Sequence, residues 1–287
     1  MEKNEDLMTK ASTTKALILA AGRGERMRPL TDHTPKPLLE VRGQPLMQWA
    51  KQALAAGGFT DFVINTAWLG EKISTHFGEK FSLEISLKPP YLLPEQLLKN
   101  EQKNTEKGDD LVAVNIRYSH EGRDFGGALE TAGGIVRALP MLCNSEDDVF
   151  WVLAGDVFAP DFVFSQDAVD RFKASDKLAH IWLVPNPEHN TKGDFGLQSD
   201  GQVLNDAGSN GQKYTFSTIA LYRKSLFSLP YCDIPVGNPE GVKAALAPLL
   251  RKAIAAQQVS GELYTGTWTD VGTPERLSQI NMQINNS

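Results

Sequence analysis

Four cationic side chains lie close together near the start of the sequence, in a stretch that also contains two glycines. The cations are Arg23, Arg26, Arg28 and Lys36, which fall within fourteen residues of a chain whose formal net charge is -6. Gly22 and Gly24 let backbone amides approach an anion closely, and guanidinium and ammonium groups bind phosphate oxygens. This combination predicts a binding site for a polyphosphate.

A short apolar run must position this loop. Residues Ala16–Ala20 are typical of a strand buried on both faces, and residues 21–24 end it abruptly. A dinucleotide fingerprint needs a third glycine where Met27 stands, and no GxxxxGK[ST] pattern follows the strand. A nicotinamide site and an ordinary P-loop are therefore not supported. A basic surface turn after a core strand is the structural alternative.

Two aspartates offer a second piece of chemistry. Asp156 follows the apolar run Val149–Leu153, at the carboxyl end of a predicted strand, where open α/β sheets bind ligands. Asp270 lies in the segment W-T-D-V-G-T-P, just before a helix expected over Thr273–Ile280. Carboxylate oxygens are hard ligands that suit magnesium. Either aspartate could instead cap a local turn or helix.

The pattern around the glycine-rich loop is long and specific. It runs L-A-A-G-x-G-x-R over residues 19–26, continues with P-L-T at 29–31 and ends with T-P-K-P-L at 34–38. This pattern resembles the N-terminal motif of the sugar-1-phosphate nucleotidylyltransferase family, and the similarity extends over residues 15–280 apart from an insertion. The resemblance implies transfer of a nucleotidyl group from a nucleoside triphosphate to a sugar 1-phosphate.

The resemblance also implies roles for individual residues. Arg26 is expected to hold the departing phosphates and Lys36 the α-phosphate, while Asp156 and Asp270 are expected to bind Mg²⁺. Catalysis is therefore expected to depend on Arg26, Lys36 and Asp156. The residues expected to bind the substrates are Leu19, Ala20, Ala21, Gly22, Arg23, Gly24, Glu25, Arg26, Lys36, Asn65, Thr131, Gly133, Asp194 and Gly196.

Recognition of the base is expected at residues 129–134. Their sequence, L-E-T-A-G-G, resembles the base-contacting segment of the family. Thr131 is the predicted N-cap of a helix, and Gly133 lies behind it, which would leave helix amides free for a base edge or a phosphate. A glycine turn that merely starts a helix is the alternative.

Recognition of the sugar is expected at two other segments. Asn65 and Trp68 follow a strand end, so they could reach a sugar hydroxyl or stack on a sugar face, although core burial of Trp68 is equally compatible. The segment G-D-F-G-L over 193–197 resembles part of the family's sugar pocket, and Asp194 is the strongest candidate there. The E-E-K-P segment of many relatives is absent, and Lys243 is only a weak substitute for the residue that binds the sugar phosphate.

Shorter motifs favour one branch of the family. Members that transfer a uridylyl group from UTP to a sugar 1-phosphate in peptidoglycan recycling are the most similar in a combination of motifs: I-N-T-A-W-L-G, I-R-Y-S-x-E-G, L-E-T-A-G-G, G-D-F-G-L, Y-T-F-S-x-I-A-L-Y and W-x-D-V-G-T-P-E-R-L. Mannose-1-phosphate guanylyltransferase is the nearest alternative, followed by thymidylyl or uridylyl transfer to glucose 1-phosphate. An inactive nucleotide-sensing regulatory subunit is a further alternative. Such a subunit would more often lack one of the four expected phosphate- or metal-binding residues, all of which are present.

The sequence alternates strand-like and helix-like segments. This order predicts one Rossmann-like α/β domain over residues 15–287, with a mostly parallel, mixed and twisted sheet flanked by helices. Further strands are expected at Phe62–Asn65, Asn115–Tyr118, Val149–Leu153, His180–Val184 and Thr215–Leu221. Helices are expected at Pro45–Ala56, Thr131–Leu139 and Val242–Gln257.

Two regions fall outside this alternation. Residues 88–111 contain adjacent prolines and a polar, charged run, which predicts an inserted surface loop. Phe81–Leu87 and Leu111–Tyr118 on either side are strand-like, and could pair as a hairpin or form successive sheet strands. Residues 1–14 are expected to form a flexible tail.

Composition argues against several other functions. The acidic balance argues against broad nucleic-acid binding. Cys143 and Cys232 lack metal-ligand spacing, which argues against a zinc site and a disulfide scaffold. No stretch approaches the roughly 18 apolar residues of a membrane span, and the first residues lack the apolar core of a secretory signal. A cytoplasmic enzyme without membrane contact is expected, and no motif indicates its oligomeric state.

Overall fold

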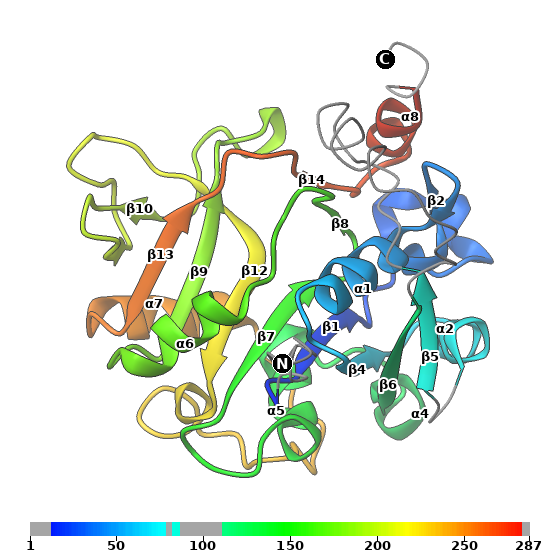
Figure 1. Ribbon diagram of the computed structural model, residues 1–287, viewed down its shortest axis with the longest axis horizontal. Coiled ribbons are helices and arrows are strands. Elements are labelled where there is room, and N and C mark those ends of the chain that lie inside the picture. The colour runs from blue at the N-terminus through cyan, green and yellow to red at the C-terminus, as the bar shows by residue number, and fades with distance from the viewer. Residues whose placement is uncertain (1–12, 79–81, 87–110, 283–287) are drawn as a thin grey trace, which may run out of the picture.

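Eight strands form the central sheet, in the order β13-β9-β12-β7-β1-β4-β6-β5 (Figure 1). The computed structural model describes residues 13–78, 82–86 and 111–282. Residues 88–110 of the expected insertion and residues 1–12 of the expected tail lie outside the described residues. Thr14, the last residue of that expected tail, is described and is buried.

The elements alternate along the chain as expected for an α/β fold. The strands of the central sheet are β1 (Ala16–Ala20), β4 (Asp61–Thr66), β5 (Ser82–Ser86), β6 (Leu111–His120), β7 (Val149–Ala154), β9 (Ala179–Val184), β12 (Thr215–Arg223) and β13 (Val259–Leu263). The α-helices are α1 (Leu46–Ala56), α2 (Gly70–Phe77), α4 (Glu121–Phe125), α5 (Glu130–Leu142), α6 (Gln166–Ala174), α7 (Leu246–Ala255) and α8 (Pro274–Met282). Three short ladders pair β2 (Glu40–Val41) with β3 (Gln44–Pro45), β8 (Val157–Phe158) with β14 (Thr269–Asp270), and β10 (Gly196–Leu197) with β11 (Val203–Leu204).

The central sheet is mixed and mostly parallel, as predicted. All its strands run in one direction except β12 and β5, each of which is antiparallel to its neighbours. The antiparallel pairing of β5 with β6 shows that these two segments form a hairpin. Because β7, β1, β4 and β6 are parallel neighbours, the segments that follow them meet at one edge of the sheet.

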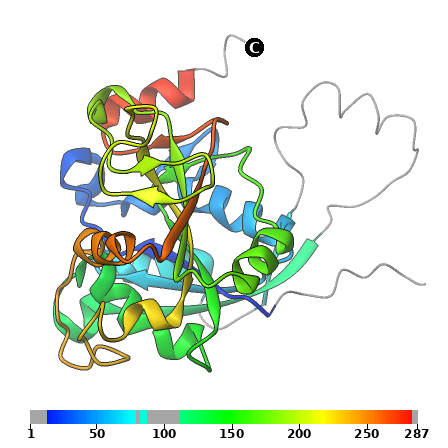
Figure 2. The ribbon, with the colours of Figure 1, turned by 90° about the vertical axis from the view of Figure 1, so that its left-hand side faces the viewer.

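Helices cover both faces of this sheet (Figures 1 and 2). Leu17 of β1 packs in the core beneath α5 and α7. Ala16 and Ile18 point the other way, into a second core beneath α1, α2 and α6. Successive residues of a strand face opposite sides, so a strand buried on both faces must be continuously apolar. This explains the unbroken hydrophobic run of β1.

A third, smaller core lies beyond the carboxyl ends of the strands. It joins Met27 in the glycine-rich loop to Trp49 of α1, Phe158 of β8, Val271 after β14 and Ile280 of α8. Met27 and Val271 are fully buried. Burial of a side chain of this size stabilises a fold by about 1.5–3 kcal/mol. Met27, which breaks the dinucleotide glycine pattern, therefore anchors the loop against the chain's C-terminal segment.

The predicted elements are present, with two differences near α5. Residues 242–245, expected to be helical, are extended, and α7 begins only at Leu246. The carbonyl of Ala244 accepts hydrogen bonds from the amides of Ala132 and Gly133, which holds this segment against α5. The prediction of Thr131 as an N-cap is wrong, because α5 begins at Glu130. The helices α2, α4 and α6 and the central-sheet strand β13 were not predicted.

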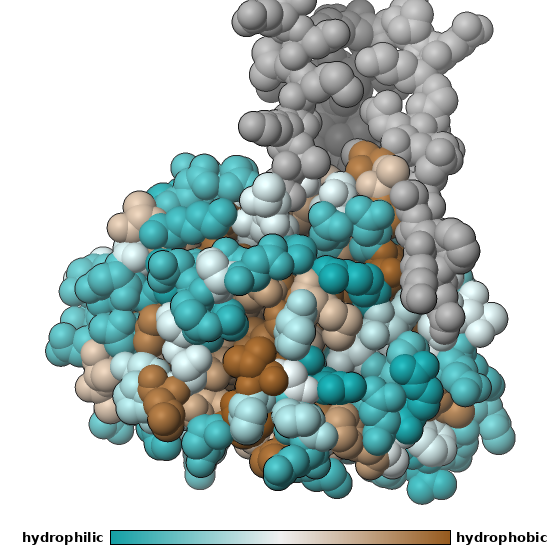
Figure 3. Space-filling model, turned by 90° about the horizontal axis from the view of Figure 1, so that it is seen from below, coloured by the Kyte–Doolittle hydropathy of each residue, from teal (hydrophilic) through white to brown (hydrophobic). Residues whose placement is uncertain are grey.

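Cys143 and Cys232 are both free and buried. Burial raises the pKa of Cys143 to about 12, which leaves its thiol protonated and unreactive at neutral pH. Hydrophilic side chains cover most of the face seen from below, and hydrophobic ones form small patches among them (Figure 3). Within the described residues, no helix is both long enough and apolar enough to cross a membrane.

Candidate active site

A cavity of about 700 Å³ opens where the parallel strands end. It is bounded by the segments that follow β1 and β7, by the start of α5, by β12 and by α7. Of the residues expected to bind the substrates or Mg²⁺, those that line it are Leu19, Ala20, Ala21, Gly22, Lys36, Asn65, Thr131, Asp156 and Asp194. Those that do not line it are Arg23, Gly24, Glu25, Arg26, Gly133, Gly196 and Asp270.

Arg23 is held inside the loop. Its guanidinium donates to the carbonyl of Thr31 at 2.9 Å and lies 3.6 Å from the ring centroid of Trp68. Arg23 and Arg28 both donate to Asp32. Burial alone would raise the pKa of Asp32, but these hydrogen bonds and charges lower it. These contacts make Arg23, and Trp68 beneath it, part of the loop's framework.

Arg26 is the arginine of this loop that stays free. It is exposed, and no hydrogen bond or ion pair joins it to another residue in the described part of the chain. Its Nη2 lies 3.2 Å from the position that a Cβ atom on Gly272 would take. Gly24, with φ +67°, supplies the left-handed turn that starts the short 3-10 helix Glu25–Met27. The loop therefore presents Arg26 beside the segment that carries Asp270.

Lys36 and Asp156 form an ion pair at the cavity wall. The Lys36 ammonium donates to Oδ2 of Asp156, and their side chains are 11% and 35% exposed. Lys36 begins a short 3-10 helix, Lys36–Leu38, and Asp156 lies in the turn between β7 and β8. The pair thus joins the loop after β1 to the end of the neighbouring parallel strand.

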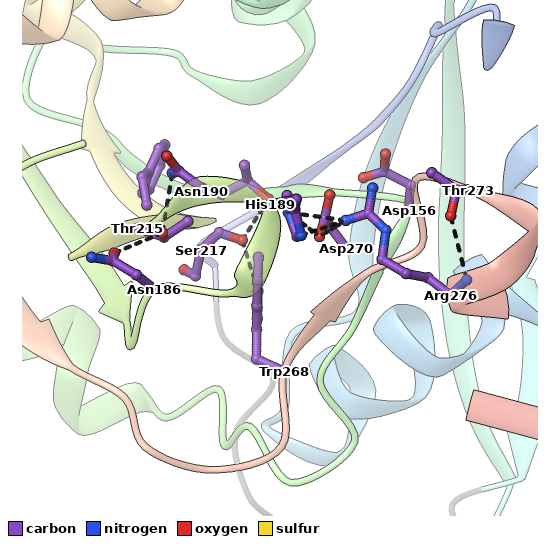
Figure 4. Close-up of polar contacts among 12 residues, drawn as sticks. Asp156, Asn186, His189, Asn190, Thr215, Ser217, Trp268, Asp270, Thr273 and Arg276 are labelled. Carbon is purple, nitrogen blue, oxygen red and sulfur yellow. Dashed lines mark hydrogen bonds and ion pairs between the residues drawn. The ribbon is translucent and has the colours of Figure 1, made fainter. Parts of the chain in front are cut away.

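The short ladder between β8 and β14 brings Asp270 to Asp156. Asp270 pairs with Val157, and the amide of Val271 donates to the carbonyl of Asp156 at 2.9 Å. Asp270 also accepts a hydrogen bond from Arg276 of α8 at 2.5 Å, and Nε2 of His189 lies 3.0 Å from the same oxygen. In Figure 4 the Arg276 guanidinium points at Asp270, with Asp156 beside it.

The two aspartates fit a divalent cation. Their oxygens are hard ligands from adjacent segments, and each carboxylate already binds a cationic side chain, Lys36 or Arg276. The described ranges contain no group of three or more His, Cys, Asp or Glu residues able to hold a metal ion. A metal here would therefore take its remaining ligands from substrate phosphates and water.

The start of α5 forms another part of the cavity wall. Thr131 and Glu130 line the cavity, and Glu130 has φ +59°, an uncommon conformation for a residue with a side chain. The amide of Gly133 donates to the carbonyl of Ala244 at 3.1 Å, so it is not free for a ligand. A Cβ atom on Gly133 would lie 2.5 Å from the carbonyl oxygen of Val242. Gly133 therefore permits close packing of α5 and does not reach the cavity.

Of three residues considered for sugar recognition, Asp194 lines the cavity, whereas Gly196 and Lys243 do not. Asp194 lines the cavity, where it accepts hydrogen bonds from the amide of Phe216 at 2.8 Å and from Asn190 at 3.3 Å. Gly196 is buried, and a Cβ atom there would lie 2.1 Å from the carbonyl oxygen of Asp206, which indicates a packing role. Lys243 is exposed on the extended segment before α7 and does not line the cavity.

Several residues of the site carried no signal that identified them in the sequence. Arg276 belongs to the W-x-D-V-G-T-P-E-R-L motif, but its contact with Asp270 depends on the start of α8. His189 comes from a separate 3-10 helix, Glu188–Asn190. Glu121 belongs to the motif I-R-Y-S-x-E-G, but its contact with Asn65 depends on two strand ends that are far apart in the sequence, between which it is fully buried. Only the tertiary fold brings these side chains to the site.

Comparison with known proteins shows the family to which the chain is related. Residues 15–205 match a protein family described as "Nucleotidyl transferase". Over 270 residues, the chain is 41% identical to N-acetylmuramate alpha-1-phosphate uridylyltransferase of Neisseria meningitidis serogroup B, which covers 92% of this chain and 96% of that protein. It is 28% identical to mannose-1-phosphate guanylyltransferase catalytic subunit beta of Drosophila pseudoobscura pseudoobscura, over 93% of this chain and 61% of that one.

A solved structure supports the fold independently. UDP-glucose pyrophosphorylase from Acinetobacter baumanii has a TM-score of 0.62 and 15% sequence identity, and the match covers 94% of this chain and 92% of that one. This likeness shows the fold alone. The family match and the relative at 41% identity confirm the resemblance found in the sequence motifs. The chain belongs to the nucleotidyl transferase family.

Proposed function

We propose that this protein transfers a uridylyl group from UTP to N-acetylmuramic acid α-1-phosphate, giving the UDP-sugar and pyrophosphate. The proposal is carried by the meeting of Lys36, Asp156 and Asp270 beside the cavity and the glycine-rich loop. The 41% identity to a uridylyltransferase for that sugar phosphate supports this choice of base and sugar. A cytoplasmic role in peptidoglycan recycling, without membrane or nucleic-acid partners, goes with these substrates.

The reaction is a displacement at the α-phosphorus of UTP. An oxygen of the sugar phosphate bonds to this phosphorus, the bond to the oxygen that bridges to the β-phosphate breaks, and pyrophosphate leaves with the electron pair. The attacking phosphate is already ionised at neutral pH, so the step needs no general base. Catalysis rests on aligning two anions and neutralising their charge.

Each charged side chain has a place in this scheme. The Lys36 ammonium, oriented by Asp156, moves to the α-phosphate as negative charge develops there. Arg26, which is free and beside the Asp270 segment, binds the β- and γ-phosphates. Enzymes of this family generally use a divalent metal ion. We assign Mg²⁺ to Asp156 and Asp270, where it would neutralise and align phosphate oxygens.

The cavity wall supplies recognition. The open space around Gly22 lets backbone amides approach the phosphates. Thr131, which lines the cavity at the start of α5, is assigned to the base, and Asp194 to a sugar hydroxyl. A hydrogen bond from a sugar hydroxyl to the Asp194 carboxylate would make the site selective among sugar phosphates. An analogue that lacks this hydroxyl would leave a polar group of the site unpaired.

The test is pyrophosphate release with Mg²⁺, in which UTP, dTTP and GTP are crossed with the 1-phosphates of N-acetylmuramic acid, N-acetylglucosamine, glucose and mannose. The highest catalytic efficiency is expected with UTP and the N-acetylmuramic acid substrate. A preference for GTP and mannose 1-phosphate would replace the substrates and keep the mechanism. No release with any pair would contradict the enzyme function and favour a nucleotide-sensing subunit.

A further inference from the structure

A continuous chain of buried hydrogen bonds crosses the floor of the site. Asn65, at the end of β4, is 2% exposed, and Glu121, where β6 meets α4, is fully buried. Asn65 donates to Oε1 of Glu121 at 2.6 Å and accepts from the amide of Ala20 at 2.8 Å. Oε2 of Glu121 accepts from the amide of Leu129 at 2.8 Å. We call Asn65 and Glu121 together the Asn65–Glu121 bridge.

The two ends of this bridge hold two separate segments of the cavity wall. Ala20 lines the cavity itself and leads directly into Ala21 and Gly22, which line the side of the glycine-rich loop. Leu129 lies between two lining residues, Ala128 and Glu130, at the start of α5. The bridge therefore sets the distance between the wall assigned to the phosphates and the wall assigned to the base.

The wall at α5 needs such support. Glu130 has φ +59°, and a residue in this conformation persists only where its surroundings hold it. Its neighbour Leu129 is held on both sides, because its amide donates to Glu121 and its carbonyl accepts from the amide of Ala244 at 3.1 Å. Loss of either bond would let the α5 wall move.

Burial of the Glu121 carboxylate is energetically unfavourable. Burial raises its pKa above the usual range, and the hydrogen bonds from Leu129 and Asn65 oppose that shift. Buried charges are costly, and apolar residues often stabilise a core at least as well. The chain also makes room for the bridge, since a Cβ atom on Gly134 would lie 2.5 Å from Oε1 of Glu121. A role beyond stability accounts for these features.

We propose that the Asn65–Glu121 bridge is a positioning device that sets the spacing of the nucleotide cradle, so that affinity for the nucleoside triphosphate depends on it. Asn65 then acts through Ala20 and not as a ligand of the sugar. This inference rests on the proposed function, because it takes the nucleotide to span the two walls.

Variants that exchange the amide and the carboxylate between positions 65 and 121 test the proposal. In Glu121→Gln, an amide NH₂ replaces one carboxylate oxygen and meets another donor. In Asn65→Asp, two carboxylates face each other. In the double variant Asn65→Asp/Glu121→Gln, Asp at 65 accepts from Ala20 and from the new amide at 121, whose carbonyl oxygen accepts from Leu129. The double variant therefore restores the number of hydrogen bonds and the total charge.

The measurement is the dissociation constant of UTP with Mg²⁺, determined by calorimetry without the sugar phosphate, together with the KM of each substrate. Each single variant is expected to weaken UTP binding roughly ten- to a hundredfold, as for an unsatisfied buried polar group. The KM of the sugar phosphate should change much less. The double variant should recover most of the lost affinity.

A matched pair at the other end of the same strands provides the control. Asn115 of β6 donates to Asp61 of β4 at 3.0 Å, and this pair is exposed. Asn115→Asp also places two carboxylates face to face, but it should leave UTP affinity unchanged. Gly134→Ala is a second probe, because it displaces the bridge without altering charge, and it should also weaken UTP binding.

The outcomes separate this inference from the proposed function. Single variants and Gly134→Ala that melt at lower temperature yet bind UTP like the wild type would show that the bridge is only structural. A folded double variant with no recovered affinity would also overturn the inference. A wild-type protein that binds none of UTP, dTTP and GTP would instead contradict the proposed function itself.

Discussion

At the scale of single residues, the centre of the site consists of two carboxylates that each bind a cation of the protein. Lys36 pairs with Asp156, and Arg276 pairs with Asp270. These cations reduce the repulsion between two neighbouring carboxylates when no metal ion is bound. A divalent ion that binds both aspartates must therefore compete with both side chains.

This competition predicts that Arg276→Gln binds Mn²⁺ more tightly than the wild type. Loss of a partly buried pair worth about 1 kcal/mol would increase the affinity about fivefold. The measurement is a Mn²⁺ titration followed by electron paramagnetic resonance, with Mg²⁺ as competitor. Arg171→Gln is the control, because exposed Arg171 pairs with Asp167 on the distant helix α6. Weaker binding of Mn²⁺ by Arg276→Gln would show that Arg276 supports the metal site.

Lys51 of α1 predicts a pH dependence of stability. It is 1% exposed, lies 3.7 Å from the ring centroid of Phe77, and burial lowers its pKa to about 7. Between pH 10.5 and about 7 the unfolded chain carries a proton here that the folded protein lacks. The unfolding free energy contributed by this residue therefore rises with pH across that window and is lowest below it.

The corresponding variant is Lys51→Met. It is expected to raise the unfolding free energy at pH 7 by about 1–3 kcal/mol, because it removes a buried polar group. Thermal denaturation at pH 7 and pH 10 is the measurement, and the gain should shrink at the higher pH. Lys252→Met, at an exposed position of α7, should change neither value. A variant that melts below the wild type at pH 7 would refute this explanation.

At the scale of elements, the start of α5 is shaped by its packing partners. The extended segment before α7 lies against Gly133, and the Asn65–Glu121 bridge lies against Gly134. Glycine in a helix normally costs about 1 kcal/mol relative to alanine. The two glycines of the L-E-T-A-G-G motif are therefore explained by close approach of other backbone and side-chain atoms.

The close packing around Gly133 and the open space around Gly22 predict different effects for two alanine substitutions. Gly133→Ala should lower the unfolding free energy by about 1–3 kcal/mol, because the added methyl group would meet the carbonyl of Val242 at 2.5 Å. Gly22→Ala should leave stability nearly unchanged, since no atom lies within 4 Å of the added methyl group, but it should weaken UTP binding. Denaturant unfolding and UTP titration of both variants give the two readouts. Stabilisation by Gly133→Ala would contradict the packing role.

At the scale of the whole molecule, the sequence predicted what local patterns can specify. The runs Ala16–Ala20 and Val149–Leu153 are continuously apolar because helices cover both faces of the sheet, and both strands were predicted with bounds close to those observed. Parallel strand ends then placed the glycine-rich loop and Asp156 at one edge. The position of Asp270 at the same edge was predicted from the family resemblance and not from periodicity.

Long-range partners could not be predicted in this way. Arg23, expected to bind phosphate, is held by Thr31, Asp32 and Trp68. Asn65 was expected to reach a sugar. Its side-chain oxygen accepts a hydrogen bond from the amide of Ala20, and its side-chain nitrogen donates to Glu121. A motif identifies the type of side chain available at a position, but the partners that use its hydrogen bonds come from other elements of the fold.

Nucleotidyl transfer at this site should depend on the carboxylate of Asp156, and two aspartate variants measure that dependence. The rate of pyrophosphate release from UTP and N-acetylmuramic acid α-1-phosphate would be measured for the wild type, for Asp156→Asn and for Asp161→Asn, a change at a nearby exposed aspartate outside the cavity. Asp156→Asn should reduce kcat by about a thousandfold or more with an unchanged fold by circular dichroism, and Asp161→Asn should match the wild type. Metal-dependent turnover of Asp156→Asn close to the wild-type rate would show that Asp156 takes no part in catalysis.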